Sequence, residues 1–211
     1  MRVAFLPSTD PIENAAAEER LFRERPFPDE PRLIFYTNTE CVQCGRNQEP
    51  YTECAVTQCV AQGIPVIKRI SGGGTVFHDL GNQNYAFLLP RRDYDPAKIL
   101  ALVVEALHRI GVADARFCQR FSVWHGDFKI AGSAFALSGP AALLHGCLPF
   151  TTNLDRLRQF LTPERPYDAT SHAVASVVSP VANIAELVPE PADCRERFCA
   201  ALAALAEAYF A

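Results

Sequence analysis

The stretch that most constrains the fold runs from residue 68 to residue 85 and reads KRISGGGTVFHDLGNQNY. Its three adjacent glycines, Gly72 to Gly74, cost conformational entropy and bring no side chain to a core. Such a run suits a place where main chain comes close to a ligand, because successive N–H groups can form a concave anion site. Arg69 precedes the glycines. The loop is therefore suited to holding a carboxylate or a phosphate.

A glycine-rich hairpin that binds nothing is the alternative interpretation of this stretch. The basic pair, the glycine run, the β-branched run and the His78-Asp79 pair occur together, which favours a ligand site. Asp79 is expected to be an acceptor that fixes the loop rather than a base. His78 has two possible roles, either contact with the ligand or a hydrogen bond that places the loop.

The residues that follow the three glycines are typical of β-strands. Residues 75–77 and 84–89 are β-rich and are predicted to pair with each other, which places the loop on a sheet. A P-loop would instead need GK[ST] at its end. The other predicted strands lie at 32–37, 41–45, 121–123, 128–135, 141–150 and 174–181. Helices are predicted from Asp10-Pro11, over 50–62, from Asp95-Pro96, over 154–161 and from Pro191.

The bulk composition limits the function classes. A chain of 211 residues that is 49% hydrophobic and 21% charged is expected to form one domain with a sizeable core. The net charge is −4 and no basic run is present, which argues against nucleic acid as a partner. No apolar stretch reaches the ~18 residues of a membrane span, and the first residues do not resemble a secretory signal. We therefore expect a cytoplasmic protein.

Eight cysteines are many for a cytoplasmic chain. The spacing of Cys41 and Cys44 is CxxC, but a zinc site would need a second such pair, and none is present. We therefore predict no metal site and expect most of the thiols to be free and buried. The cysteines are at positions 41, 44, 54, 59, 118, 147, 194 and 199.

Five blocks in one order connect these features to a known family. The glycine stretch at 68–85 resembles the lipoate-binding loop RRxSGGGxVxHDxGN of lipoate–protein ligase A. FKIAGSAF at 128–135 resembles the K-I-x-G-x-A segment of that family, and LHGCL at 144–148 resembles HHGTL. CGRNQEPYTEC at 44–54 and SVVSPVANIAEL at 176–187 resemble two further blocks. The chain is identified as a member of the biotin/lipoate ligase superfamily.

The resemblance implies a fold and an activity. The fold would be α/β (α+β), with a mixed, largely antiparallel sheet flanked by helices, of the biotin/lipoate protein ligase catalytic-domain type. The activity would be activation of lipoate with ATP and Mg²⁺ as lipoyl-AMP. The lipoyl group would then pass to a lysine of a lipoyl-domain protein, such as an E2 subunit or the glycine cleavage H protein.

The resemblance also implies a set of site residues. Lys129 would be the central cation, in contact with both the acyl carbonyl and the phosphate, because charge that develops in the reaction needs fixed cations and N–H donors. Arg69 would contact the phosphate, and His145 would either line the site or be a satisfied core histidine. The implied binding residues are Arg69, Ser71, Gly72, Gly73, Gly74, Thr75, Val76, Phe77, His78, Asn82, Gly132, Ala134 and His145.

Several alternatives stay open. Residues 1–211 would form a single catalytic domain, and the C-terminal accessory domain of full-length members would be absent. The chain could then act with a separate small partner protein or transfer lipoyl from preformed lipoyl-AMP. It could also be an octanoyltransferase, with a thioester on Cys118 and Lys129 stabilising the oxyanion. A non-catalytic lipoate- or biotin-binding module is the last alternative, against which Lys129 and Arg69 argue.

Overall fold

The computed structural model describes residues 1–24, 26–168, 170 and 172–211. Within these residues the strands form a seven-stranded sheet and a three-stranded sheet. The large sheet has the order β1 (Arg2–Phe5), β2 (Arg32–Tyr36), β6 (Asn82–Pro90), β10 (Ala141–Pro149), β9 (Phe128–Ser138), β8 (Val123–His125) and β7 (Arg116–Phe117). Strands β1 and β2 are parallel and the other neighbours are antiparallel. The sheet is therefore mixed and largely antiparallel, as the family resemblance implies.

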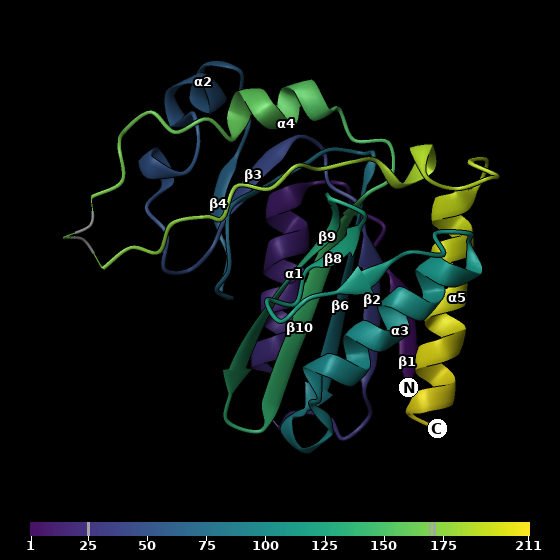
Figure 1. Cartoon of the computed structure of the whole chain (residues 1–211). Helices are drawn as coiled ribbons and strands as arrows, with labels where there is room; N and C mark the ends of the chain where they lie inside the picture. Colours follow the sequence, from purple (N-terminus) through teal and green to yellow (C-terminus); the bar gives the residue numbers. More distant parts are fainter. Residues whose placement is uncertain (25, 169, 171) are drawn as a thin grey trace.

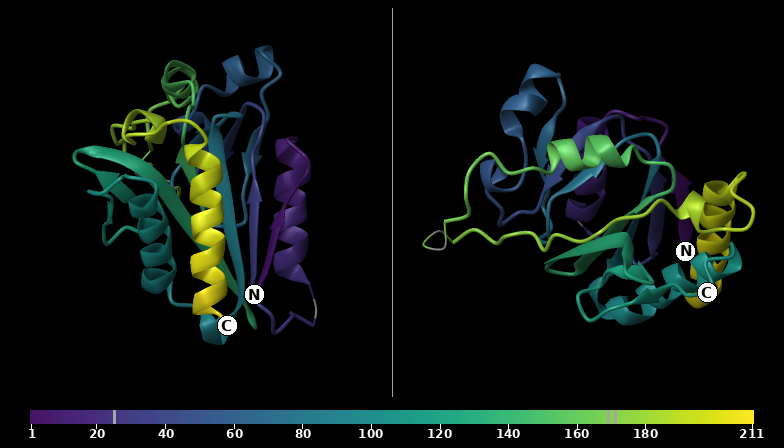
Figure 2. Two further views of the ribbon diagram at one scale, coloured as in Figure 1. Left: turned by 90° about the vertical axis from the view of Figure 1, so that its right-hand side faces the viewer. Right: turned by 45° about the horizontal axis from the view of Figure 1, so that its top comes forward.

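Helices cover both faces of the large sheet (Figures 1 and 2). Helix α1 (Pro11–Arg23) lies on one face, and α3 (Pro96–Arg109) and α5 (Cys194–Tyr209) lie on the other. The predicted helix starts at Asp10-Pro11 and Asp95-Pro96 are confirmed. Each aspartate is the N-cap of its helix, and its side chain accepts hydrogen bonds from two backbone N–H groups. No helix among the described residues has the length and apolar character to cross a membrane.

The central strand β6 shows why these layers form. Side chains alternate across a strand, so Tyr85, Phe87 and Leu89 pack with α3 and α5, whereas Ala86 and Leu88 pack on the side of α1. Every residue of β6 is buried. A strand with both faces covered belongs in the middle of a sheet, and β6 lies between β2 and β10.

The three-stranded sheet has the order β4 (Val66–Lys68), β3 (Cys41–Cys44) and β5 (Val76–His78). Helices α2 (Val56–Ala61) and α4 (Leu154–Phe160) lie over it (Figure 1). The apolar cluster beneath them contains Phe77, whose ring stacks on that of Phe160 at 5.8 Å. Short 3-10 helices complete the elements, at Pro50–Thr52, Arg91–Asp93 and Ile184–Glu186.

The predicted pairing of residues 75–77 with 84–89 is wrong. Strand β5 pairs with β3 in the small sheet, and β6 pairs with β2 and β10 in the large one. The chain turns sharply between them at Gly81, where a Cβ would lie 2.4 Å from the carbonyl of Thr151. This close approach directs β6 away from β5, so the turn joins the two sheets instead of closing a hairpin.

Three further segments differ from the prediction. The helix predicted over residues 50–62 is divided into a 3-10 turn, Pro50–Thr52, and α2. The β-branched run at 174–181 joins no named strand, and its one β-bridge is between Val181 and Lys129. Its backbone bonds are few: Val174 N donates to Asn47 O in a loop, and Pro180 O accepts from Lys129 N on β9. Strand β1 was not predicted, because its four residues are largely exposed at an edge.

Candidate active site

The glycine loop connects β4 to β5, and the Arg69 side chain folds back over it. Its Nε donates to Ser71 Oγ at 3.0 Å, and its two Nη atoms donate to three carbonyls. These carbonyls belong to Gln43 at 2.8 Å, Gly72 at 2.7 Å and Gly74 at 2.6 Å. Desolvation lowers the pKa of Arg69, but a guanidinium stays charged in proteins. The guanidinium therefore braces the loop from inside.

Two glycines are required by the path of this loop. A Cβ on Gly45, just after β3, would lie 2.0 Å from the carbonyl oxygen of Gly73. Gly73 itself has φ +85°, a conformation that residues with a Cβ rarely adopt. The glycine loop thus packs main chain against main chain at Gly45. The predicted close approach to a ligand stays a prediction.

A chain of buried hydrogen bonds fixes the loop to the large sheet and to α1. Ser71 Oγ lies 2.6 Å from His145 Nε2, and His145 Nδ1 lies 2.7 Å from Glu18 Oε1. Tyr36 donates its hydroxyl to the other Glu18 oxygen at 3.0 Å. An ionised carboxylate only accepts, so Nδ1 of His145 donates, and in a neutral ring Nε2 then accepts from Ser71. His145 is a satisfied core histidine that positions Ser71.

His78 is buried at the end of β5, away from solvent. Asn38 Nδ2 donates to its Nδ1 at 3.2 Å, and its Nε2 has no partner among the described residues. Burial, followed by the charge of Arg69, lowers the pKa of His78 to about 3. The imidazole is therefore neutral. Asn14 of α1 donates to Asn38, so the helix supports this corner of the loop.

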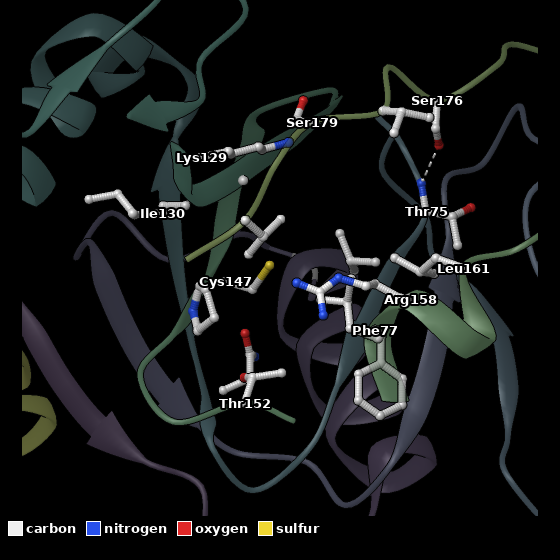
Figure 3. Close-up of a pocket in the computed structure, with 18 of the residues that line it drawn as sticks. Thr75, Phe77, Lys129, Ile130, Cys147, Thr152, Arg158, Leu161, Ser176 and Ser179 are labelled. Carbon is white, nitrogen blue, oxygen red and sulfur yellow. Dashed lines mark hydrogen bonds between the residues drawn. The ribbon is translucent and has the colours of Figure 1, made fainter. Parts of the chain in front are cut away.

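A cavity of about 320 Å³ opens beside the loop, between the two sheets (Figure 3). Six of the predicted site residues line it: Thr75, Val76, Phe77, Asn82, Lys129 and Gly132. The remaining predicted residues are outside its wall: Arg69, Ser71, Gly72, Gly73, Gly74, His78, Ala134 and His145. Of this second group, Arg69 and His145 support the loop from behind through their bonds to Gly72 O and Ser71 Oγ.

Lys129 brings the cation to this cavity from β9. Its backbone N–H donates to Pro180 O at 2.8 Å, which ties the strand to the segment after α4. A Cβ on Gly132 would lie 3.6 Å from Lys129 Nζ, so the glycine leaves room beside the ammonium. The block FKIAG therefore places a positive charge next to an open space.

Sequence reasoning missed the network that closes the opposite wall. Ser176 Oγ accepts from Thr75 N at 2.9 Å (Figure 3). It also accepts from Gln48 Nε2 at 2.9 Å and donates to Glu53. Gln48 Oε1 accepts from Gly45 N at 2.9 Å and from the Thr75 hydroxyl at 2.8 Å. Gln48, Glu53 and Ser176 lie in the two outer family-like blocks, so the signal was present, but only the structure shows that these blocks meet.

Two residues with an expected role lie elsewhere. Asp79 accepts from the backbone N–H groups of Gly81 and Asn153, at 2.9 and 2.8 Å, and so fixes the turn between the sheets. Cys118 lies in the turn between β7 and β8, where its N–H donates to Ser122 O, and it does not line the cavity. The cysteine in the cavity wall is Cys147, on β10.

A family model described as the lipoyl protein ligase A/B catalytic domain matches residues 10–206. The chain belongs to this family. Among its lipoyl ligase relatives, lipoate-protein ligase A of Psychrobacter cryohalolentis is 37% identical over 188 residues, which make up 88% of the chain and 55% of that relative. The chain thus spans about half the length of this relative.

Solved lipoyl ligase structures share the fold. A bi-partite lipoate protein ligase from Thermoplasma acidophilum, studied with its E2 lipoyl domain, is 26% identical, with a TM-score of 0.80 over 98% of this chain and 83% of that chain. A lipoate-protein ligase A bound with ATP is 24% identical, with a TM-score of 0.76, and the match covers 98% of this chain and 85% of that chain. The predicted family and its catalytic-domain fold are confirmed.

The packing of the loop gives a stability prediction for this lipoyl ligase domain. Gly45→Ala should lower the free energy of unfolding by about 1–3 kcal/mol, because its Cβ would meet the Gly73 carbonyl oxygen and the loop would have to move. Gly72→Ala is the matched control, since no atom lies within 4 Å of its Cβ, and it should change stability by less than about 0.5 kcal/mol. Urea denaturation of both variants measures the difference; equal stabilities would contradict the contact.

Burial of His78 gives a pH prediction. Its pKa is about 3 in the folded state and about 6.5 unfolded, so the unfolded state binds the proton first as the pH falls. Stability is full above about pH 6.5 and declines towards pH 3. When the pH falls from 7 to 5, the free energy of unfolding of His78→Gln should therefore decrease by about 2 kcal/mol less than that of the wild type. The exposed His172→Gln is the control and should keep the wild-type slope; the same slope in His78→Gln would refute the assignment.

Proposed function

We propose that the domain activates lipoate with ATP as lipoyl-AMP and transfers the lipoyl group to a lysine of a lipoyl-domain protein. The observation that carries the proposal is the position of Lys129, whose ammonium lies in the cavity wall beside Gly132. The cavity volume, about 320 Å³, is within the range of about 300–1,000 Å³ usual for small-molecule sites. Val76 and Phe77 add an apolar wall for an acyl chain.

The chemistry needs a cation at two moments. A lipoate carboxylate attacks the α-phosphorus of ATP, the bond to pyrophosphate breaks, and negative charge builds on the phosphoryl oxygens. The amine of an acceptor lysine then attacks the acyl carbon, and AMP leaves from the tetrahedral adduct. A fixed ammonium such as that of Lys129 stabilises the charge at both steps without moving. The backbone from Thr75 to Phe77 lies across the same cavity and would hold the nucleotide.

ATP and lipoate are substrates in this proposal, in keeping with the ATP-bound and lipoate-ligase relatives. Mg²⁺ would enter with the triphosphate. No group of three or more His, Cys, Asp or Glu side chains suited to a metal gathers among the described residues. Glu53, a carboxylate in the cavity wall, is bonded to Ser176. The phosphates and water would therefore supply most of the ligands, as is usual for this ion.

The acceptor would be a lipoyl domain, such as that of an E2 subunit or the glycine cleavage H protein. The bi-partite relative was studied with its E2 lipoyl domain, which supports a lipoyl domain as the acceptor. The exposed side chains of Val177 and Val178 lie at the cavity and would be available to the acceptor.

A lipoyltransferase that uses preformed lipoyl-AMP is the second candidate. Such an enzyme needs the same cation and cavity but no ATP. The Cys118 thioester mechanism has less support, because that thiol is not in the cavity wall.

Lipoate-dependent ATP–pyrophosphate exchange by the purified chain tests the function. Exchange is expected in the wild type. Lys129→Ala should reduce it by at least about 100-fold, because one fixed charge donor is lost from the transition state. Lys98→Ala is the control, since Lys98 is an exposed lysine of α3 paired with Asp95, and it should retain the wild-type rate.

Two results would correct the proposal. A wild-type exchange rate in Lys129→Ala would remove the mechanism. If the wild type shows no ATP–pyrophosphate exchange but transfers the lipoyl group from added lipoyl-AMP to a lipoyl domain, the chain is a transferase instead.

A further inference from the structure

The cavity contains a second cation, which no sequence motif indicates. Arg158 of α4 lines the wall, together with Leu157 and Leu161 from the same helix and its end. Lys129 belongs to another part of the wall, on β9 of the large sheet. Figure 3 shows the guanidinium of Arg158 and the ammonium of Lys129 turned towards the middle of the cavity from these two elements. The cavity therefore has a positive charge on each of two walls.

Other contacts of α4 hold the helix in this position. Arg156 Nε donates to Glu40 Oε1 at 2.7 Å, and its guanidinium lies 4.6 Å from the centre of the Phe160 ring. Phe160 in turn stacks on Phe77, whose strand borders the cavity. Arg156 is thus used to fix the helix on the small sheet, whereas Arg158 is left to face the cavity.

The guanidinium of Arg158 has most of its five N–H donors available. Among the described residues its partner is Asp155, whose Oδ1 accepts from Nη1 at 2.8 Å. The two side chains are 68% and 94% exposed, and an ion pair exposed to this degree contributes little to stability. A ligand with a strong negative charge can therefore bind the remaining donors or displace the carboxylate.

The charges of the cavity wall favour a ligand with two anionic centres. Three of the described lining residues are charged: Glu53, Lys129 and Arg158. Glu53 accepts from the backbone N–H of Ser176 at 3.1 Å and from its hydroxyl, so this carboxylate is bound within the wall. The two cations remain to face the ligand. The single phosphate of an acyl-adenylate would occupy Lys129, whereas ATP carries two further phosphates that need a cation of their own.

We propose that Arg158 binds the β- and γ-phosphates of ATP and so selects a nucleoside triphosphate, an inference that rests on the proposed ligase function. A planar guanidinium offers paired N–H donors that match phosphate oxygens. The lipoate carboxylate attacks the α-phosphorus, the α–β phosphoanhydride bond breaks, and its electron pair leaves on the pyrophosphate oxygen. Arg158 stabilises this charge. After pyrophosphate has left, Arg158 has no phosphate to bind and takes no part in the transfer of the lipoyl group.

Separate kinetics of the two half-reactions test the proposal. In lipoate-dependent ATP–pyrophosphate exchange, Arg158→Ala should raise the KM for ATP and for pyrophosphate by at least about tenfold, because a charged contact with the phosphates is lost. The KM for lipoate should not change. Transfer from preformed lipoyl-AMP should keep the wild-type rate, since this compound has no β-phosphate. Arg158→Lys keeps the charge and should recover part of the affinity for ATP. Arg109→Ala is the matched control, because Arg109 is an exposed helical arginine paired with Glu105 one turn earlier, and it should behave as the wild type.

The contrary outcomes are distinct. A wild-type KM for ATP in Arg158→Ala would overturn the proposal and leave the ligase function intact. Slower transfer from lipoyl-AMP, with a raised KM for the lipoyl domain, would also overturn it and assign Arg158 to the acceptor protein. If the wild type shows no exchange, calorimetric titration of the folded chain with ATP decides the question. Binding that is about tenfold weaker in Arg158→Ala than in the wild type would uphold the proposal, and equal binding or none would overturn it.

Discussion

The guanidinium of Arg69 is the interaction on which the site depends. Three consecutive glycines have no side chains that could hold the loop in one conformation. Their conformational entropy in the unfolded chain also opposes the ordering of the loop. Arg69 supplies the missing contacts, because its donors reach the Ser71 hydroxyl and the carbonyls of Gln43, Gly72 and Gly74. A charge withdrawn from water needs such partners, so the loop and the arginine stabilise each other.

The braced loop joins the two sheets at the cavity. From the side of the large sheet, Ser71 is held by the buried His145–Glu18 pair. From the side of the small sheet, the loop touches Gly45, and its last residue, Thr75, is bonded to Ser176. The backbone that faces the cavity is therefore fixed before any ligand enters. Preorganised donors of this kind need no rearrangement during the reaction, which is the basis of electrostatic catalysis.

Sequence alone predicted the local features well, because their causes are local. The Asp-Pro helix starts, the glycine loop and the position of Lys129 all follow from short motifs. Long-range geometry was less accessible. The turn at Gly81 sends β5 and β6 to different sheets, and only the packing against residue 151 explains it. The bonds from Arg69 to the carbonyls of Gly72 and Gly74 are also long-range geometry that no motif indicates, and the expected contact of Arg69 with a phosphate stays a prediction.

The most direct test is a crystal structure of the chain with a non-hydrolysable lipoyl-adenylate analogue. The account predicts that the acyl-phosphate group lies in the cavity, with Lys129 Nζ within about 3 Å of one of its oxygens. It also predicts that the Arg69 contacts to the glycine carbonyls persist. An analogue bound elsewhere, or a glycine loop that has released Arg69 while Lys129 points away from the ligand, would contradict it.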